Sequence, residues 1–337
     1  FDLYFGTDVP NWPPFCFIEQ DRTVGIPGEF LSATLLEKNQ ASNQGPALKD
    51  WTLEPILPAL GDRASRFIED SAKQSRPFLL YLPLTSPHTP LSVNEKWKGK
   101  SGLGLYADFV METDAVVGEV LGAIEKSGTK EDTLVVFTSD NGCAHYIGVN
   151  ELEEKGHFPS GPLRGYKADA WEGGHRVPFI VRWPGVIKPA SVNDQLVHQA
   201  DLLATFAEIV GAELPDDAGE DSFSFVSLLK GSKEPIRKTS VSCSNRGVPS
   251  IRLNEWKFLP VPGSGGWGKG GDQTQPSQLY HLGSDLSESR NRADKEPEKV
   301  AELQALLETL ITQGRSTPGP AQENDVEVKR FQPEPLH

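Results

Sequence analysis

The feature that most constrains the fold is an apolar run, Leu-Val-Val-Phe at 134–137, that breaks off into Thr-Ser-Asp-Asn-Gly at 138–142. Successive apolar residues leave no solvent-facing side, so the run predicts a buried strand at 134–138. In open α/β sheets, ligands bind where such strands end. Asp140 and Asn141 offer a carboxylate and an amide oxygen there, which are ligands for a hard cation such as Ca²⁺. Ordinary turns use the same residues, so the motif alone leaves both interpretations open.

A second apolar run, 78–82, precedes a segment with helical spacing of apolar residues, 105–127, that leads into the 134–138 strand. This order predicts a βαβ unit with parallel strands. Parallel pairing would bring His88, which follows the first strand, and Asp140 to one edge of the sheet. Taken alone, His88 is better explained as a loop histidine hydrogen-bonded to the backbone. Its expected convergence with Asp140 is what favours a functional role for both residues.

The remaining patterns indicate an α/β chain with a smaller α+β part at its C-terminal end. Prolines interrupt residues 1–60, which we expect to be irregular. The other expected elements are helices at 61–75, 201–210 and 294–313, strands at 177–183, 239–243, 249–253, 256–261 and 279–282, and glycine-rich loops at 143–176 and 263–271. We expect a domain at 1–232, an α+β subdomain with an antiparallel sheet at 233–314, and a loose tail at 315–337.

Composition excludes some functions and leaves others open. The chain has 337 residues, 37% of them hydrophobic, which is enough for a large core. Its net charge of −14 argues against nucleic acid as a partner, and local cations would have to hold any anionic substrate. The 3 cysteines are too scattered for a zinc cluster or a disulfide framework. No apolar run approaches the ~20 residues of a membrane span.

Several motifs, in this order and spacing, resemble the sulfatase family of the alkaline-phosphatase-like superfamily. They are Ser-Pro-His-Thr-Pro (86–90), Phe-Thr-Ser-Asp-Asn-Gly (137–142), the segment from Leu163 to Phe179, Leu-Tyr-His-Leu (279–282) and Ser-Asp-Leu-Ser-Glu-Ser-Arg-Asn (284–291). Within this family, the chain resembles arylsulfatases and N-acetylgalactosamine-6-sulfatases. The resemblance implies an α/β sandwich with a central, largely parallel or mixed sheet flanked by helices.

The resemblance also implies a calcium-dependent hydrolase of sulfate esters, with one Ca²⁺ ion. Asp140 and Asn141 match a pair that completes the family's calcium site. His88 matches the histidine that protonates the leaving alcohol, and Lys167 matches the lysine that contacts the sulfate. Fixed cations stabilise the charge that builds up on the sulfate oxygens, and a poor alkoxide leaving group needs a proton donor.

One departure concerns the nucleophile. The family makes a formylglycine from the Cys or Ser of a Cys/Ser-x-Pro/Ala-x-Arg motif, and Cys16, Cys143 and Cys243 all lie in other contexts. Two further calcium aspartates are also missing, and in the family these parts lie upstream of Phe1. We therefore expect an N-terminally truncated sulfatase that is inactive alone. The family resemblance implies a periplasmic, extracellular or lysosome-like location.

The substrate is expected to be a small-molecule or glycan sulfate ester. Polar and aromatic residues near Lys167 are candidates for binding its alcohol part, and for each of them a structural role is equally open: His157, Arg164, Asp169, Trp171, Glu172 and His175. Two alternatives remain. One is a phosphoesterase of the same superfamily, which would typically hold two zinc ions. The other is a relative that binds sulfated glycans without cleaving them.

Overall fold

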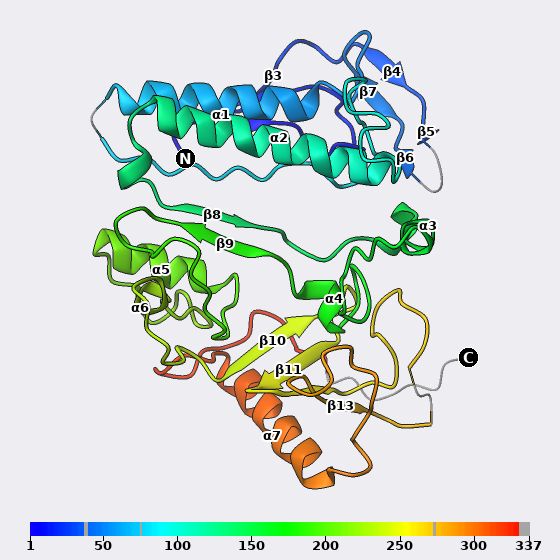
Figure 1. Cartoon of the computed structure of the whole chain (residues 1–337), viewed down its shortest axis with the longest axis vertical. Helices are drawn as coiled ribbons and strands as arrows, with labels where there is room; N and C mark the ends of the chain where they lie inside the picture. The colour runs from blue at the N-terminus through cyan, green and yellow to red at the C-terminus, as the bar shows by residue number, and fades with distance from the viewer. Residues whose placement is uncertain (37–39, 75, 272–273, 330–337) are drawn as a thin grey trace. The chain divides into compact units, whose positions relative to one another are not determined.

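The computed structural model describes residues 1–36, 40–74, 76–271 and 274–329, and these form two compact units (Figure 1). The first unit contains residues 1–133 and 146–157, and the second contains 134–145 and 158–337. This division differs from the boundary that the sequence suggests near residue 232. In the described part of the chain, no helix is both long and apolar enough to cross a membrane.

The first unit begins with short strands, where the sequence predicts only irregular chain. They form a three-stranded sheet, β1-β2-β3, and two pairs, β4-β7 and β5-β6. The strands are β1 (Phe5–Gly6), β2 (Ile18–Glu19), β3 (Arg22–Thr23), β4 (Glu29–Leu31), β5 (Thr34–Leu36), β6 (Gln40–Ser42) and β7 (Gly45–Ala47). Each has at most three residues. Strands of this length carry too little alternation to be detected in a proline-rich segment.

Two long helices, α1 (Ile56–Ala72) and α2 (Leu105–Lys126), pack together in this unit, and α3 (Val149–Glu154) is much shorter. A buried cluster of Leu57, Val93, Phe109 and Val116 joins α1 to α2. Helix α1 begins earlier than the predicted residue 61. Pro58 is tolerated because the first turn of a helix has no acceptor for its missing N–H. The predicted last residue of this helix, 75, lies outside the described residues.

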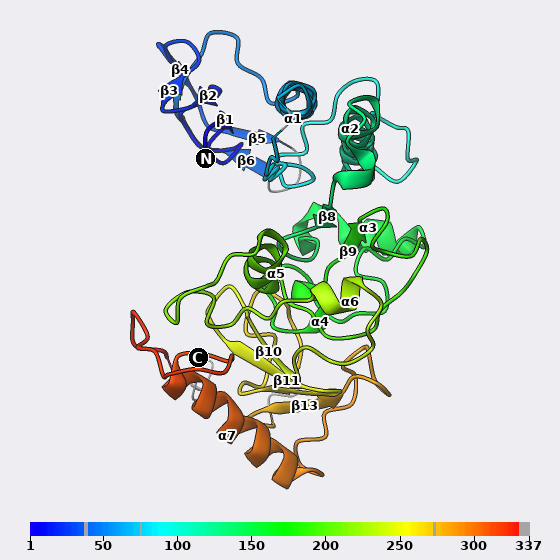
Figure 2. The ribbon, with the colours of Figure 1, turned by 90° about the vertical axis from the view of Figure 1, so that its left-hand side faces the viewer.

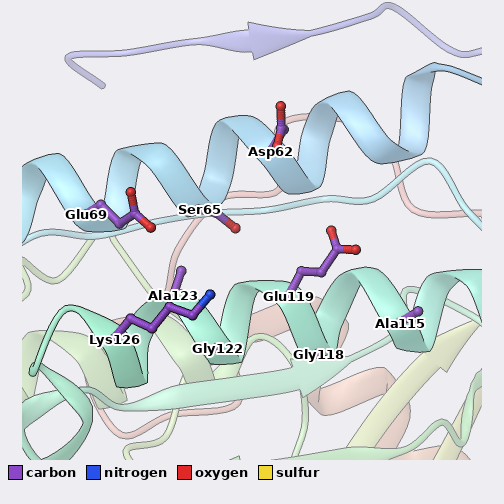
Figure 3. A pocket seen from close by; sticks show the side chains of 9 residues that line it. All are labelled: Asp62, Ser65, Glu69, Ala115, Gly118, Glu119, Gly122, Ala123 and Lys126. Carbon is purple, nitrogen blue, oxygen red and sulfur yellow. The ribbon is translucent and has the colours of Figure 1, made fainter.

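A shallow groove runs between these two helices (Figure 3). Its α1 side carries Asp62, Ser65 and Glu69, and its α2 side includes Gly118 and Gly122. The small residues on α2 leave this groove open, because glycine has no side chain to fill the space.

The prediction of a βαβ unit from 78–82 to 134–138 is wrong. Residues 78–82 form no strand, and Leu79 and Tyr81 are 61% and 73% exposed. The strand predicted at 134–138 exists as β8 (Val135–Thr138), but it pairs antiparallel with β9 (Phe179–Arg182). An apolar run indicates that a segment is suited to burial, whereas its hydrogen-bonding partner depends on which backbone lies beside it.

The second unit contains the antiparallel sheet predicted for the C-terminal part. Its order is β10-β11-β12-β13, all antiparallel. The strands are β10 (Thr239–Cys243), β11 (Pro249–Leu253), β12 (Trp256–Leu259) and β13 (Gln278–His281), and the helices of this unit are α4 (Glu172–His175), α5 (Asp201–Val210), α6 (Val226–Leu229) and α7 (Pro297–Gln313).

The two faces of this sheet carry different residues. Helix α7 lies along one face (Figure 1 and Figure 2), where Leu303 and Leu307 join Ile251, Phe258 and Leu279 in a buried cluster. Successive strand residues point to opposite faces, so the neighbours of Phe258 and Leu279 lie on the other side. There, Leu259 and Tyr280 pack against Ala170 and Trp171 of the 163–176 loop. The sheet is therefore the support on which this loop rests.

Residues 315–322, which the sequence suggests to be part of a loose tail, make specific contacts. Arg315 is 7% exposed, and its Nη1 donates to the carbonyl oxygen of Asp216 at 3.2 Å. The backbone N–H of Ser316 donates to Glu220 at 3.1 Å. A buried guanidinium needs acceptors, and Asp216, Thr317 and Pro320 provide them. Residues 330–337 of the predicted tail lie outside the described part.

Candidate functional site

The Asp-Asn-Gly turn follows β8 directly, as the sequence predicts. The carboxylate of Asp140 is exposed and Asn141 is half-buried. Nδ2 of Asn141 donates to the carbonyl oxygen of Gly142 at 3.0 Å, and Ser139 Oγ donates to the carbonyl oxygen of Asn141 at 3.0 Å. These bonds fix the turn and use the nitrogen of the Asn141 amide, which leaves its oxygen for another partner.

The fit of this turn to Ca²⁺ follows from its donors. Carboxylate and amide oxygens are of the right kind for a hard cation, but Ca²⁺ takes about 6–8 oxygen ligands. Among the described residues, no group of three or more His, Cys, Asp or Glu side chains is arranged to hold a metal. Asp140 and Asn141 therefore fit as part of a calcium site that needs further ligands.

The Lys167 loop is hydrogen-bonded directly to this turn. The backbone N–H of Lys167 donates to Cys143 at 2.8 Å, and that of Gly142 donates to Gly174 at 3.0 Å. A Cβ atom at Gly142 would lie 1.9 Å from the carbonyl oxygen of Gly173, so only glycine allows this approach. The side chain of Lys167 is half-buried, and its ammonium has no ion pair among the described residues. The structure thus places an available cation on the same hydrogen-bonded assembly as Asp140.

Several of the predicted substrate residues belong to this loop and are buried. Asp169, Trp171 and Glu172 are each at most 3% exposed. Asp169 accepts from the backbone of Tyr166 at 3.0 Å and from that of Gly268 at 2.7 Å. Trp171 donates through Nε1 to Gln278 at 3.0 Å. In this structure their partners are protein groups, and contact with substrate stays a prediction.

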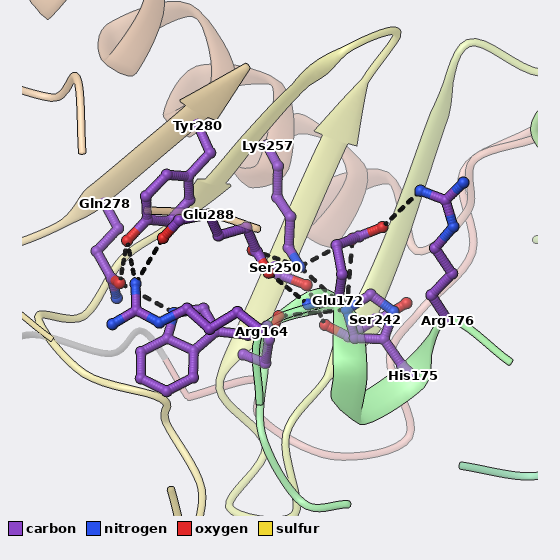
Figure 4. A network of polar contacts seen from close by, with 12 residues as sticks. Arg164, Glu172, His175, Arg176, Ser242, Ser250, Lys257, Gln278, Tyr280 and Glu288 are labelled. Atoms are coloured by element: carbon purple, nitrogen blue, oxygen red, sulfur yellow. Dashed lines mark hydrogen bonds and ion pairs between the residues drawn. The ribbon is translucent and has the colours of Figure 1, made fainter. Parts of the chain in front are cut away.

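Arg164 is also held by the second unit. Its guanidinium lies 3.8 Å from the centre of the Trp171 ring. Its Nη1 donates to the hydroxyl of Tyr280 at 3.0 Å and to the carbonyl oxygen of Glu288 at 2.7 Å (Figure 4). Cation–π stacking and two hydrogen bonds fix this side chain toward the sheet.

A buried charged cluster lies at the base of the loop (Figure 4). Nζ of Lys257, on β12, lies 2.9 Å from Oε1 of Glu172 and 3.0 Å from Oε1 of Glu288. It also lies 3.2 Å from Nε2 of His175. The same Nε2 lies 3.2 Å from the carbonyl oxygen of Ala170, so it has a donor on one side and an acceptor on the other. The side chains of Lys257, Glu172 and Glu288 are 1%, 4% and 0% exposed.

The cluster shifts the pKa values of its members. Burial alone would raise the pKa of Glu172, but the charge and hydrogen bond of Lys257, together with His175 and Arg252, lower that pKa to about 2. Burial, and then the charge of Lys257, lower the pKa of His175 to about 4. Burial raises the pKa of Glu288, against the opposing effect of Lys257. Lys257 thus pairs mainly with an ionised Glu172 beside a neutral histidine.

Two predicted site residues belong to the first unit. His88 is exposed, and its Nδ1 lies 2.6 Å from the carbonyl oxygen of Thr89. A carbonyl can only accept, so Nδ1 carries a proton and Nε2 is the nitrogen that exchanges one. His157 is exposed after α3, and its backbone N–H donates to Leu152 at 2.9 Å. The other predicted site residues all belong to the second unit.

Lys257 and Glu288 are the residues that the sequence analysis missed. Lys257 had a detectable signal, because it interrupts the apolar run Trp256 to Leu259 on the same strand face as Leu259. Glu288 has none in its immediate sequence, since it lies in a polar loop and is 0% exposed only through tertiary contacts.

The Asp140-Asn141 turn offers oxygen ligands that suit a cation, and Lys167, on the loop hydrogen-bonded to the chain at this turn, offers a positive charge that suits an anion. The family model described as Sulfatase matches residues 38–212, just over half of the chain. The chain belongs to the sulfatase family. The predicted α/β, alkaline-phosphatase-like fold class is thereby confirmed.

Individual relatives agree with this assignment. N-acetylgalactosamine-6-O-sulfatase of Bacteroides thetaiotaomicron is 34% identical over 270 residues, which cover 78% of this chain and 52% of that protein. Human arylsulfatase A is 35% identical over 224 residues, 63% of this chain and 43% of that protein. The chain spans about half the length of the curated relatives it matches.

Solved structures extend the comparison to the fold. One from work on the metabolism of multiple glycosaminoglycans by Bacteroides thetaiotaomicron matches with a TM-score of 0.78 and 28% identity, over 92% of this chain and 72% of that one. A structure of Ps i-CgsB in complex with k-i-k-neocarrahexaose matches with a TM-score of 0.64 and 25% identity, over 80% and 57%.

Proposed function

We propose that the protein containing this chain hydrolyses sulfate monoesters. The observation that carries the proposal is the pair of backbone hydrogen bonds that joins the Lys167 loop to the Asp140-Asn141-Gly142 turn. They hold Lys167, which has no ion pair with any described residue, near the two oxygen ligands of Asp140 and Asn141, and hydrolysis of a sulfate ester uses both kinds of group. Membership of the sulfatase family supports the same reaction.

Each residue has a distinct part in the proposed reaction. Lys167 binds the sulfate oxygens and stabilises the negative charge that grows on them during attack. His88, protonated, donates its Nε2 proton to the ester oxygen as the S–O bond breaks, because Nδ1 is occupied by Thr89. Asp140 and Asn141 would hold the cation.

Two groups outside the described residues complete the proposal. A bound Ca²⁺ would supply electrostatic stabilisation of the sulfate, and a formylglycine would supply the nucleophile. The cysteines lie in other contexts, and the one match to Cys/Ser-x-Pro/Ala-x-Arg in the printed sequence is Ser160 to Arg164, within the Lys167 loop region, where the hydroxyl of Ser160 donates to the carbonyl oxygen of Gly165 at 3.1 Å. We propose that another segment of the protein supplies the formylglycine and the remaining calcium ligands. The 337-residue chain by itself is therefore expected to release no sulfate.

For the substrate we propose a sulfated carbohydrate, with an aryl sulfate as the second choice. Support comes from relatives named for action on N-acetylgalactosamine-6-sulfate and for binding a neocarrahexaose. A net charge of −14 means that local cations such as Lys167 must attract such a substrate. Periplasmic, extracellular or lysosome-like location stays a prediction.

The test is an assay of the full-length protein, purified with Ca²⁺, on sulfated mono- and disaccharides and on 4-nitrophenyl sulfate, with released sulfate measured directly. Turnover that is lost with a calcium chelator and restored by Ca²⁺ is the expected result. Turnover of the matched phosphate esters with bound zinc would establish the phosphoesterase alternative. Saturable binding of the sulfated sugar without release of sulfate would establish the non-catalytic alternative.

A further inference from the structure

The 163–176 loop contains the proposed sulfate-binding lysine, and the C-terminal sheet supplies several of the contacts that fix this loop. Three separate groups of contacts join them: the Lys257 cluster, the hydrogen bond from Trp171 to Gln278, and the hydrogen bonds of Arg164 (Figure 4). Lys257 and Tyr280 are directly opposite one another on neighbouring strands. Their side chains therefore lie on one face of the sheet, the face that the loop covers.

We propose that Lys257 and Glu288 are positioning residues of the sulfate-binding site. They hold the 163–176 loop and thereby fix the position of Lys167 relative to the Asp140-Asn141 turn. The inference rests on the proposed function for its catalytic consequence. Its structural part, the coupling of the sheet to the loop and the turn, does not depend on which ester is cleaved.

The first step of the coupling is the binding of Glu172 by Lys257 and Glu288. Lys257 binds its carboxylate at 2.9 Å, and Oε2 of Glu288 accepts its backbone N–H at 2.7 Å. Both the side chain and the backbone of one loop residue are therefore held by the sheet side. Glu172 begins α4, and a carboxylate that accepts a backbone N–H at a helix start is a strong hydrogen bond.

The second step leads from α4 to the turn. Gly173 and Gly174 follow Glu172 immediately, and Gly174 accepts the N–H of Gly142 at 3.0 Å. A Cβ atom at Gly173 would lie 2.1 Å from the carbonyl oxygen of Gly165, so the loop closes tightly upon itself at this point. Movement of Glu172 is therefore transmitted to Gly142 and, through the closed loop, to Lys167.

The backbone around Glu288 is held in an unusual conformation. Glu288 has a positive φ of 48°, which is unusual for a residue other than glycine. Asp285 stabilises the turn around it by accepting the backbone N–H groups of Ser289 at 3.1 Å and Arg290 at 2.9 Å. A local backbone conformation of this kind persists only when neighbouring contacts enforce it.

The experiment compares two variants of the full-length protein. Lys257→Met removes the ammonium at nearly constant volume, and Leu303→Ala is the matched control, because it destabilises the same sheet through α7 and lies outside the loop contacts. Hydrogen–deuterium exchange is measured on peptides covering 140–144 and 164–176 and on peptides covering β11. Activity on a sulfate ester is measured in parallel.

The expected result for Lys257→Met is faster exchange confined to the two site segments and a loss of kcat/KM of about 100-fold, the scale of an ångström-level misplacement. Leu303→Ala should speed exchange in β11 and leave activity within about twofold at a temperature where it is folded. Equal losses of activity in the two variants, or exchange that rises uniformly in Lys257→Met, would overturn the proposal.

A second pair keeps the proposal testable if Lys257→Met fails to fold. Glu288→Gln keeps an acceptor for the N–H of Glu172, whereas Glu288→Leu removes it. The first should exchange like the wild type in 164–176 and the second should exchange faster there; indistinguishable exchange in the two would contradict the proposal. If the wild type cleaves no sulfate ester while these exchange patterns hold, the proposed function falls and the positioning role stands.

Discussion

The backbone N–H of Lys167 donates to the carbonyl oxygen of Cys143 at 2.8 Å, which ties the 163–176 loop to the chain immediately after the Asp-Asn-Gly turn. Residues separated by 24 positions in sequence are thereby fixed to one another by backbone atoms. The side chain of Lys167 stays available for a ligand. Anchoring through the backbone fixes the position of the lysine and leaves its ammonium group to bind a ligand.

Replacement of Lys167 should remove stabilisation of the charged sulfate. We expect Lys167→Ala to lower kcat/KM for a sulfate ester by about 100- to 1,000-fold, the loss typical of one oxyanion contact. Steady-state kinetics on the full-length protein measure this. Lys188→Ala, at an exposed lysine of the same unit, is the control and should change nothing. Equal effects of the two changes would show that only overall charge matters.

The loss of activity in the His88→Gln variant should depend on the leaving group of the substrate. Its kcat should fall by about 100- to 10,000-fold for a sugar sulfate, because an alkoxide needs a proton. The loss should be much smaller for 4-nitrophenyl sulfate, since a nitrophenolate leaves without protonation. The same enzyme preparation serves for both substrates. An identical loss on the two substrates would contradict a role for His88 as the acid.

Calcium affinity should depend on Asp140. We expect Asp140→Asn to weaken Ca²⁺ binding by more than about tenfold, since loss of even an outer-shell partner has effects of that size. Isothermal titration calorimetry on chelator-treated, full-length protein gives the affinity. The exposed Asp194 of the same unit supplies the control variant Asp194→Asn, which should bind Ca²⁺ like the wild type.

Two glycine substitutions should have opposite effects on stability. Gly142→Ala should lower the free energy of unfolding by about 1–3 kcal/mol or more, because the new Cβ would lie 1.9 Å from Gly173. Gly122→Ala, in α2, meets nothing within 4 Å and should raise it by about 0.5–1 kcal/mol. Denaturant unfolding measures both, and a stable Gly142→Ala protein would show that the turn is not closely packed.

Stability should fall on acidification through His175. Its pKa is about 4 in the folded chain and 6.5 when unperturbed, so below pH 6.5 the unfolded chain takes up a proton that the folded chain refuses. This disfavours folding as the pH falls from 6.5 to 4, by at most about 3 kcal/mol. Glu172, with a folded pKa of about 2 against 4.5, adds a similar loss below pH 4.5.

Denaturant unfolding at several pH values measures this effect as the difference between the wild type and His175→Gln. The wild type should lose more stability than the variant between pH 6.5 and 4. Parallel pH curves for the two proteins would mean that His175 titrates normally in the folded state.

Local sequence patterns were sufficient where a structure depends on neighbouring residues. The bounds of α5, β10 and β11 match the predicted ranges, because α5 has helical spacing of apolar residues and the two strands are short alternating segments bounded by turn residues. The Asp-Asn-Gly turn after β8 was predicted for the same reason. The same reasoning failed for 78–82, whose apolar residues are consistent with a strand but whose backbone pairs with no strand in the described chain.

By itself, the sequence determined the α/β class, the sulfatase motifs and the identities of Asp140, Asn141, His88 and Lys167 as candidates. Tertiary structure alone decided that β8 pairs with β9, and that the loop around Lys167 rests on a buried Lys257 from a distant strand. The physical reason is the range of the interactions. Spacing records burial and turn chemistry over a few residues, whereas an ion pair across 85 residues exists only after folding removes both charges from water.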